Sequence, residues 1–178
     1  MTATGQSKLR DFLICWLPLI FYCLAIFIQS GQPGPELIPD VKFLDKFLHF
    51  GAYGLLGILF FRAYETLPLK NFKNLLILIS IGSATLYGIS DEIHRNPELA
   101  FKEFKAAQLL ANELKKAGFN VEHGVAGMET AIIAVHPDES MGPTIAILGE
   151  YDALPEIGHA CGHNLIATSA LGACLALG

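Results

Sequence analysis

The sequence predicts a mixed fold, in which transmembrane α-helices come first and a partial α/β domain follows. Two observations support this prediction. Apolar residues make up 52% of the 178 residues, above the share of about 45–50% that is usual in soluble domains, and nearly all of the excess lies before Ser90. From Asp91 to Ser140 the chain is charged, and helical and strand patterns alternate. The net charge of −5 gives no reason to expect nucleic acid as a partner.

The first half contains three apolar segments. Residues 12–28 form an unbroken apolar run, long enough to cross about 30 Å of hydrocarbon. A basic stretch precedes this run, as in a signal peptide, but the bulky residues at its end are a poor cleavage site and favour a retained span. Residues 47–61 and 75–89 are shorter and rich in small residues, which allow close helix packing in lipid. Buried helices of a soluble protein are the alternative, and we expect about three transmembrane helices within residues 1–93.

Basic residues predict how these helices are oriented. Lys8 and Arg10 lie before the first apolar segment, and Arg62, Lys70 and Lys73 lie between the second and third. Such residues stay in the cytoplasm by the positive-inside rule, so the N-terminus is expected there and the chain after Ser90 on the opposite side. The lipid bilayer is the expected partner of this half. Ionisable residues at the segment ends, such as Asp45, His49 and His94, are either functional groups or interfacial anchors.

Two stretches of this half carry a family resemblance. They are Phe43-Leu44-Asp45-Lys46-Phe47-Leu48-His49-Phe50-Gly51-Ala52-Tyr53 and Leu86-Tyr87-Gly88-Ile89-Ser90-Asp91-Glu92-Ile93-His94. Both resemble signature stretches of the VanZ-like family of small membrane proteins. The resemblance stops at His94, because the chain continues with Arg95-Asn96-Pro97 and not with that family's pattern.

The second half, residues 94–178, begins with a helical pattern. Asn96, Pro97 and Glu98 are typical of a helix start, with an N-cap, a proline at the first helical position and an acid in the first turn. An apolar stripe at helical spacing follows, from Phe104 onwards. Gly118 is expected to end this helix.

Strand patterns follow the helix. Short strands are expected at residues 120–122 and 131–135, and the nearly continuous apolar run at 144–148 predicts a strand that is buried on both faces. A helix of small residues is expected at 165–177. This alternation predicts a mainly parallel or mixed sheet with functional groups at the strand ends.

Thiol, imidazole and carboxylate groups gather after the run at 144–148. Cys161 and His163 are separated by one Gly, which allows a tight turn that brings both side chains to one point, and both are ligand types of zinc-like metals. Asp152 is placed either to bind a metal or to orient a ligand imidazole. His159 lies near enough to contribute without a required role. A structural or accidental Cys-x-His pair and a nucleophilic Cys–His pair are the alternatives that these residues leave open.

Four motifs occur in order along the second half. They are His94-Arg95-Asn96-Pro97-Glu98-Leu99-Ala100-Phe101, Gly124-Val125-Ala126-Gly127-Met128-Glu129-Thr130-Ala131, Glu150-Tyr151-Asp152-Ala153-Leu154-Pro155 and Gly158-His159-Ala160-Cys161-Gly162-His163-Asn164. Together they resemble metallopeptidase family twenty, which contains aminoacylases, carboxypeptidases and amidohydrolases of amino-acid conjugates. The match is best to the amidohydrolase and dipeptidase branch, whose motif is Cys-Gly-His.

This resemblance implies a metallohydrolase domain of α/β type with a cocatalytic divalent metal, which is zinc, manganese or cobalt. Cys161 and His163 would be ligands and Asp152 a supporting carboxylate. A metal-bound hydroxide would attack the amide bond of a dipeptide or N-acyl amino acid, with a Glu as general base. In the family that base belongs to a Glu-Glu pair further along, and neither Glu150 nor Glu156 stands at its position. We therefore expect residues 94–178 to be an incomplete catalytic domain without its general base, and inactive.

The two resemblances meet at Ile93 and His94, and each lacks a later part of its family's pattern. This predicts a fragment or a fusion of two unrelated parts. The alternative function is a VanZ-like integral membrane protein of unassigned biochemistry with a foreign C-terminal tail. The expected localisation is a multi-pass membrane protein, or the cytoplasm for the hydrolase part if the fusion is an artefact.

Overall fold

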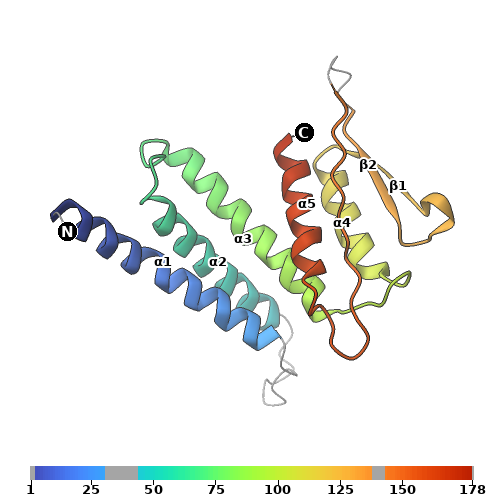
Figure 1. Ribbon diagram of the computed structural model, residues 1–178, viewed down its shortest axis with the longest axis horizontal. Coiled ribbons are helices and arrows are strands. Elements are labelled where there is room, and N and C mark those ends of the chain that lie inside the picture. Colours follow the sequence, from blue (N-terminus) through green and yellow to red (C-terminus); the bar gives the residue numbers. More distant parts are fainter. Residues whose placement is uncertain (1–2, 31–43, 138–142, 178) are drawn as a thin grey trace. The chain divides into compact units, whose positions relative to one another are not determined.

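A computed structural model of the chain describes residues 3–30, 44–137 and 143–177 (Figure 1). Contacts divide the chain into two units, residues 1–88 and 89–178. The division falls inside one continuous helix, α3 (Lys73–Arg95), slightly before the boundary at residues 93 and 94 that the sequence predicts. Part of the first VanZ-like stretch, Phe43, lies outside the described residues, as do the side chains of Leu44, Asp45 and Lys46. The side chain of Lys8, used above to predict the orientation, also lies outside them.

The first unit consists of long apolar helices: α1 (Ala3–Ser30), α2 (Leu44–Tyr64) and the larger part of α3. Each predicted apolar segment lies inside one of these helices, so the prediction of three helices is confirmed. All three are long and apolar enough to cross a membrane. The helices exceed the apolar runs at both ends because backbone hydrogen bonding continues through the polar flanking residues.

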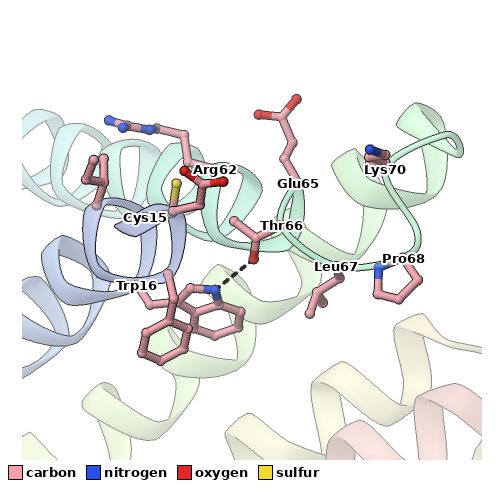
Figure 2. Close-up of a pocket in the computed structure, with 11 residues that line it drawn as sticks. Cys15, Trp16, Arg62, Glu65, Thr66, Leu67, Pro68 and Lys70 are labelled. Carbon is pink, nitrogen blue, oxygen red and sulfur yellow. Dashed lines mark hydrogen bonds between the residues drawn. The ribbon is translucent and has the colours of Figure 1, made fainter. Parts of the chain in front are cut away.

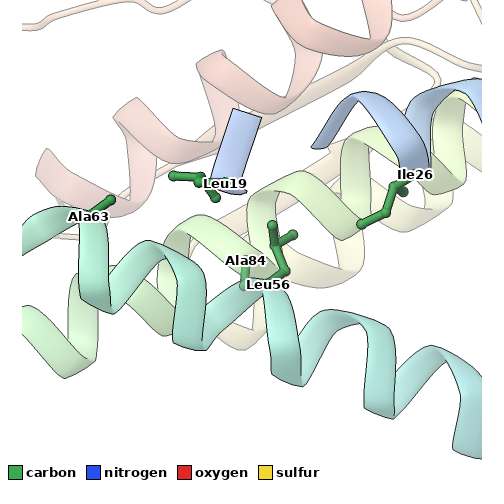
Figure 3. Packing of buried hydrophobic residues seen from close by; sticks show 5 residues of the cluster. All are labelled: Leu19, Ile26, Leu56, Ala63 and Ala84. Atoms are coloured by element: carbon green, nitrogen blue, oxygen red, sulfur yellow. The ribbon is translucent and has the colours of Figure 1, made fainter. Parts of the chain in front are cut away.

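Buried aliphatic residues join the three helices of this unit (Figure 3). The cluster consists of Leu19, Ile26, Leu56, Ala63 and Ala84, with Leu56 and Ala63 fully buried. Leu19 and Ile26 are one heptad apart on α1 and therefore share one face of that helix. The core is small, and its alanines keep the helix axes close.

Tyrosine hydroxyls supply polar links across the same core. The Tyr22 hydroxyl donates to the Ala52 carbonyl at 3.1 Å, and the Tyr87 hydroxyl to the Cys23 carbonyl at 2.6 Å. The Tyr64 hydroxyl lies 2.8 Å from the Ser83 Oγ. Each bond joins two different helices. Such bonds fix how the helices are rotated against one another, which apolar contacts alone do less strictly.

Close helix approach occurs at two of the glycines in this unit. A Cβ at Gly88 would lie 3.4 Å from the Tyr53 ring, and one at Gly57 would lie 3.9 Å from the Ala84 Cβ. Gly51, Gly54 and Gly82 have nothing within 4 Å of that position. The expected role of small residues therefore holds at Gly57 and Gly88 among the described glycines of these helices.

The outer surface of the first unit is apolar. Phe21 is 67% exposed, Phe50 80% and Leu78 67%. An amphipathic helix of a water-soluble protein turns such residues towards its core. Here large apolar side chains face outwards on all three helices.

The second unit contains the end of α3, α4 (Phe104–Lys116), β1 (Asn120–His123), the short helix η1 (Val125–Gly127), β2 (Ile132–Val135) and α5 (His163–Leu177). The strands pair antiparallel, with Asn120 opposite Val135 and His123 opposite Ile132. Helix α4 contacts α5 and both strands (Figure 1). Its buried face consists of Ala106, Ala107, Leu110, Ala111 and Leu114, which confirms the predicted stripe from Ala107 onwards.

The predicted start of α4 is wrong. The helix begins at Phe104, and Asn96 instead follows the end of α3, where its side-chain amide donates to the Glu92 carbonyl at 3.0 Å. The Glu98 carboxylate accepts hydrogen bonds from the backbone N–H groups of Lys105, at 2.8 Å, and Ala106, at 3.0 Å. The acid therefore caps α4 from outside the helix instead of forming its first turn.

The predicted end of α4 is confirmed. Gly118 has φ +94°, a left-handed conformation that glycine adopts without steric cost. The Gly118 N–H donates to the Lys115 carbonyl and the Phe119 N–H to the Leu114 carbonyl, both at 3.0 Å. This pair of bonds is a Schellman motif, which satisfies the last carbonyls of the helix.

The predicted short strands and last helix are confirmed as β1, β2 and α5, whereas the predicted strand at 144–148 is not formed. Residues 143–150 have no strand assignment and make no backbone hydrogen bond to another described residue. Ile145 is 68% exposed and Leu148 86%. An apolar run becomes a buried strand only when neighbouring strands pair with both of its edges. The described sheet is a two-stranded antiparallel hairpin, so the prediction of a mainly parallel or mixed sheet is wrong for the described residues.

Candidate metal site around His163

The candidate site consists of an extended segment, a turn and the start of α5. Glu150 and Asp152 lie on the extended segment, and His163 is the first residue of α5. Gly162, directly before it, has φ +81°, so a residue without a Cβ is required where the turn enters the helix. The Gly162 N–H donates to the His159 carbonyl at 2.9 Å and closes the turn.

His163 lies between two carboxylates. Its Nδ1 is 2.7 Å from the Asp152 Oδ1, and its Nε2 is 3.2 Å from the Glu150 Oε2. A neutral imidazole has one N–H and therefore donates to only one of these acceptors. A hydrogen bond to Asp152 places the proton on Nδ1 and leaves the Nε2 lone pair facing Glu150. That arrangement of an imidazole nitrogen and a carboxylate oxygen is favourable when a cation lies beside both.

Tyr151 fixes the direction of both carboxylates. Successive side chains of an extended segment point to opposite sides, so Glu150 and Asp152 share a side and Tyr151 points away from it. The Tyr151 hydroxyl donates to the Thr130 carbonyl at 2.6 Å, and the Thr130 hydroxyl donates to the buried Glu103 at 2.7 Å. Burial, and then the charge of Glu103, raise the pKa of Tyr151. The phenol therefore stays neutral and keeps this link at physiological pH.

Backbone contacts hold the segment after Asp152. The Ala153 N–H donates to the Glu98 carbonyl at 2.6 Å, and Ala153 pairs with Leu99 in a parallel bridge. Ala153 is only 2% exposed. The first and third motifs of the second half therefore meet at this bridge.

The start of α5 is held by Asn164, which follows His163. Its side-chain amide donates to the Ser90 Oγ at 3.1 Å, and the Thr168 hydroxyl donates to the Asn164 carbonyl at 2.7 Å. Asn164, Ser90 and Thr168 are all buried. A buried polar network of this kind is costly to break, so it fixes where His163 stands.

Cys161 is exposed. In the part of the chain that the structure describes, no group of three or more His, Cys, Asp or Glu side chains is arranged so that it could hold a metal ion, although His163 contacts two carboxylates. The assignment of Cys161 and His163 as ligands therefore stays a prediction. The donor chemistry of the loop fits a zinc-type ion, because it offers imidazole nitrogen, thiol sulfur and carboxylate oxygen within a short stretch.

The environment of His159 differs from that of Cys161, because His159 is buried. Its side chain is 6% exposed, its ring centroid is 6.3 Å from that of His94, and neither ring nitrogen hydrogen-bonds to a described residue. Burial lowers the pKa of His159 and the neighbouring His94 lowers it further, while the Ile93 backbone opposes both effects. The imidazole is therefore neutral at pH 7. It packs inside the unit instead of pointing to solvent as Cys161 does.

Two features of this site were not predicted from the sequence. The contact of Glu150 with His163 was not predicted, because it depends on how the chain between residues 150 and 163 turns back to the start of α5. The ring contact of His94 with His159 was missed because the two residues are far apart in the chain. The occurrence of both histidines in the motifs at 94–101 and 158–164 is the signal that relates them.

Comparisons with known proteins concern about half of the chain. No family model matches it. Over 106 residues it is 40% identical to one chain of the p-aminobenzoyl-glutamate hydrolase of Escherichia coli (strain K12), a match that covers 50% of this chain and 22% of that protein. It is 36% identical over 98 residues to thermostable carboxypeptidase 2 of Saccharolobus solfataricus, covering 47% of this chain and 25% of the relative. It is 41% identical over 101 residues to Xaa-Arg dipeptidase of Mus musculus, covering 52% and 23%.

The match thus spans about a quarter of the length of these curated relatives or less. Part of the chain is similar to amidohydrolases and peptidases of the family-twenty type. The VanZ-like resemblance has no support beyond the residues that suggested it.

Proposed function

We propose that residues 94–178 carry the first metal-binding motif of a metal-dependent hydrolase that cleaves the amide bond of dipeptides or N-acyl amino acids. The observation that carries this proposal is His163 held between Asp152 and Glu150 at the start of α5. The similarity of the chain to a hydrolase, a carboxypeptidase and a dipeptidase supports the proposed class of reaction.

In this proposal Cys161 and His163 hold the divalent ion, which is zinc, manganese or cobalt. Asp152 accepts the Nδ1 proton of His163, which fixes the ring orientation and directs the Nε2 lone pair to the ion. The bound ion would polarise the substrate carbonyl and lower the pKa of a water molecule. We assign no general base to this chain.

The metal assignment is tested on the full chain, purified in detergent. We expect elemental analysis to find about one divalent ion per chain. Hydrolysis of N-acyl amino acids is expected only from a protein that also contains the general base. Cys161→Ala should remove the ion, whereas Cys174→Ala, which changes a partly buried thiol inside α5, should retain it. Equal metal content in both variants would reject Cys161 as a ligand.

We further propose that α1, α2 and α3 cross a lipid bilayer, with the N-terminus in the cytoplasm. Their length and their exposed apolar side chains support this placement. Alkaline carbonate extraction of cell membranes tests it. The protein should remain in the membrane pellet, and its release into the wash would contradict the proposal.

A further inference from the structure

The first unit contains a pocket of about 730 Å³ between the early part of α1 and the end of α2 with the turn that follows (Figure 2). The candidate span of α1 begins at this pocket and that of α2 ends at it. In the proposal above, the basic residues place this side of the helices in the cytoplasm. The residues that decide its chemistry are Asp11, Trp16, Arg62, Glu65, Thr66 and Lys70. The pocket is remote in sequence from the hydrolase motifs, so its ligand is a separate question.

Trp16 forms a fixed aromatic wall of the pocket. Its indole N–H donates to the Thr66 hydroxyl at 2.9 Å, and that hydroxyl donates to the Ala63 carbonyl at 2.7 Å. The indole also stacks on Phe12 at 5.8 Å and meets the edge of Tyr64 at 6.1 Å. Tryptophan is favoured at the boundary between headgroups and acyl chains, where one side of the ring is apolar and the N–H finds a polar partner.

Charged groups form the opposite side of the pocket. In Figure 2 the charged ends of Arg62, Glu65 and Lys70 lie on one side and the Trp16 ring on the other. Asp11 pairs with Arg10 at 3.5 Å. The side chains of Arg62, Glu65 and Lys70 make no ion pair or hydrogen bond to another described residue. Two cations and one carboxylate thus remain available to a ligand.

We propose that this pocket binds the headgroup of a phosphatidylethanolamine-type lipid. The phosphate would contact Arg62, the primary ammonium would contact Glu65 about one helical turn further along, and Trp16 would lie against the glycerol region. The proposal rests on the placement of α1 and α2 in a bilayer. A phosphatidylglycerol headgroup carries the same phosphate but has no ammonium to pair with Glu65, and a choline headgroup has no N–H to donate to it.

The single tryptophan of the chain reports on this pocket. We would reconstitute the full chain in dioleoylphosphatidylcholine vesicles that contain a small fraction of lipid with brominated acyl chains. Bromine quenches indole fluorescence only at short range. Brominated phosphatidylethanolamine should quench Trp16 more than brominated phosphatidylcholine or phosphatidylglycerol at equal fraction. Equal quenching by the three lipids would overturn the proposal.

Variants of the charged side identify the contacts. Glu65→Gln should lower the preference for phosphatidylethanolamine over phosphatidylglycerol by about two- to fivefold, the range for one partly exposed ion pair. Glu122→Gln, the same change on an exposed strand residue outside the pocket, should leave it unchanged. Arg62→Gln should weaken the quenching of Trp16 by brominated phosphatidylethanolamine. Lys73→Gln, which changes a residue that does not line the pocket, should leave this quenching unchanged. If the Glu65→Gln variant kept the native preference for phosphatidylethanolamine over phosphatidylglycerol, Glu65 would be rejected as the contact of the ammonium.

Two further arms separate the possible failures. Water-soluble glycerophosphoethanolamine, added at the concentration of the brominated lipid, should not relieve the quenching. Relief would overturn the assignment of a lipid, because the pocket would then prefer the free headgroup. Carbonate extraction of the same vesicles tests bilayer insertion alone. Release of the protein would overturn both proposals, whereas retention with equal quenching would overturn only the lipid site.

Discussion

Asp152→Asn tests how the extended segment supports the proposed metal ligand. Asn keeps the size of the side chain and an oxygen that accepts the Nδ1 proton of His163, but it removes the charge behind the 2.7 Å contact. Loss of such a supporting group costs about 10–100-fold in metal affinity. The Asp152 side chain is 27% exposed, so water screens part of its charge. We therefore expect a loss near the lower limit, about tenfold or 1.4 kcal/mol.

The assay is a competitive titration of zinc against a coloured chelator, with the full chain in detergent. Glu150→Gln is the matched control, because Glu150 also contacts the ring but is 67% exposed. Its effect should be smaller than that of Asp152→Asn. Unchanged affinity in Asp152→Asn, or an equal loss in both variants, would refute the view that Asp152 orients His163.

Three further predictions concern the second unit. Glu98→Ala removes the carboxylate that accepts the Lys105 and Ala106 N–H groups, so it should destabilise α4 by about 1–2 kcal/mol and speed hydrogen exchange at those two amides; exchange at native rates would contradict the cap. Gly118→Ala places a Cβ at φ +94° with no neighbour within 4 Å, so the expected cost of about 1–2 kcal/mol is conformational, and an unchanged unfolding midpoint would argue against the Schellman end. The pKa of Tyr151 is raised in the folded chain from its usual 10.0, so the folded state holds a proton that the unfolded state loses, and stability should fall as pH rises above about 10. Tyr151→Phe should flatten that decline when thermal unfolding is measured from about pH 8 to about pH 11; an equal decline in the variant would assign it to other groups.

Local patterns predicted those elements whose stabilisation is local. Three apolar segments predicted α1, α2 and α3, because all backbone hydrogen bonds of an α-helix lie within the segment itself. Gly118 predicted the end of α4, since a left-handed residue there favours glycine in any fold.

Predictions failed where distant groups decide the structure. The N-terminus of α4 is capped by Glu98, which lies outside the helix, so the cap pattern at Asn96 misplaced the start. The apolar run at 144–148 predicts a strand only where other strands pair with it, and the described residues supply none. The contact between His163 and Glu150 depends on how the segment before α5 returns to that helix, which spacing alone does not reveal.

Cobalt(II) titration of the full chain, followed by absorption spectroscopy, tests the central claim that Cys161 and His163 hold a divalent ion. A cobalt–thiolate bond gives a charge-transfer band that nitrogen and oxygen ligands do not give. We predict that the band saturates at about one cobalt per chain, is retained in Cys174→Ala, and is lost in Cys161→Ala. A band that persists in Cys161→Ala, or no band in the native chain, would contradict the proposed metal site.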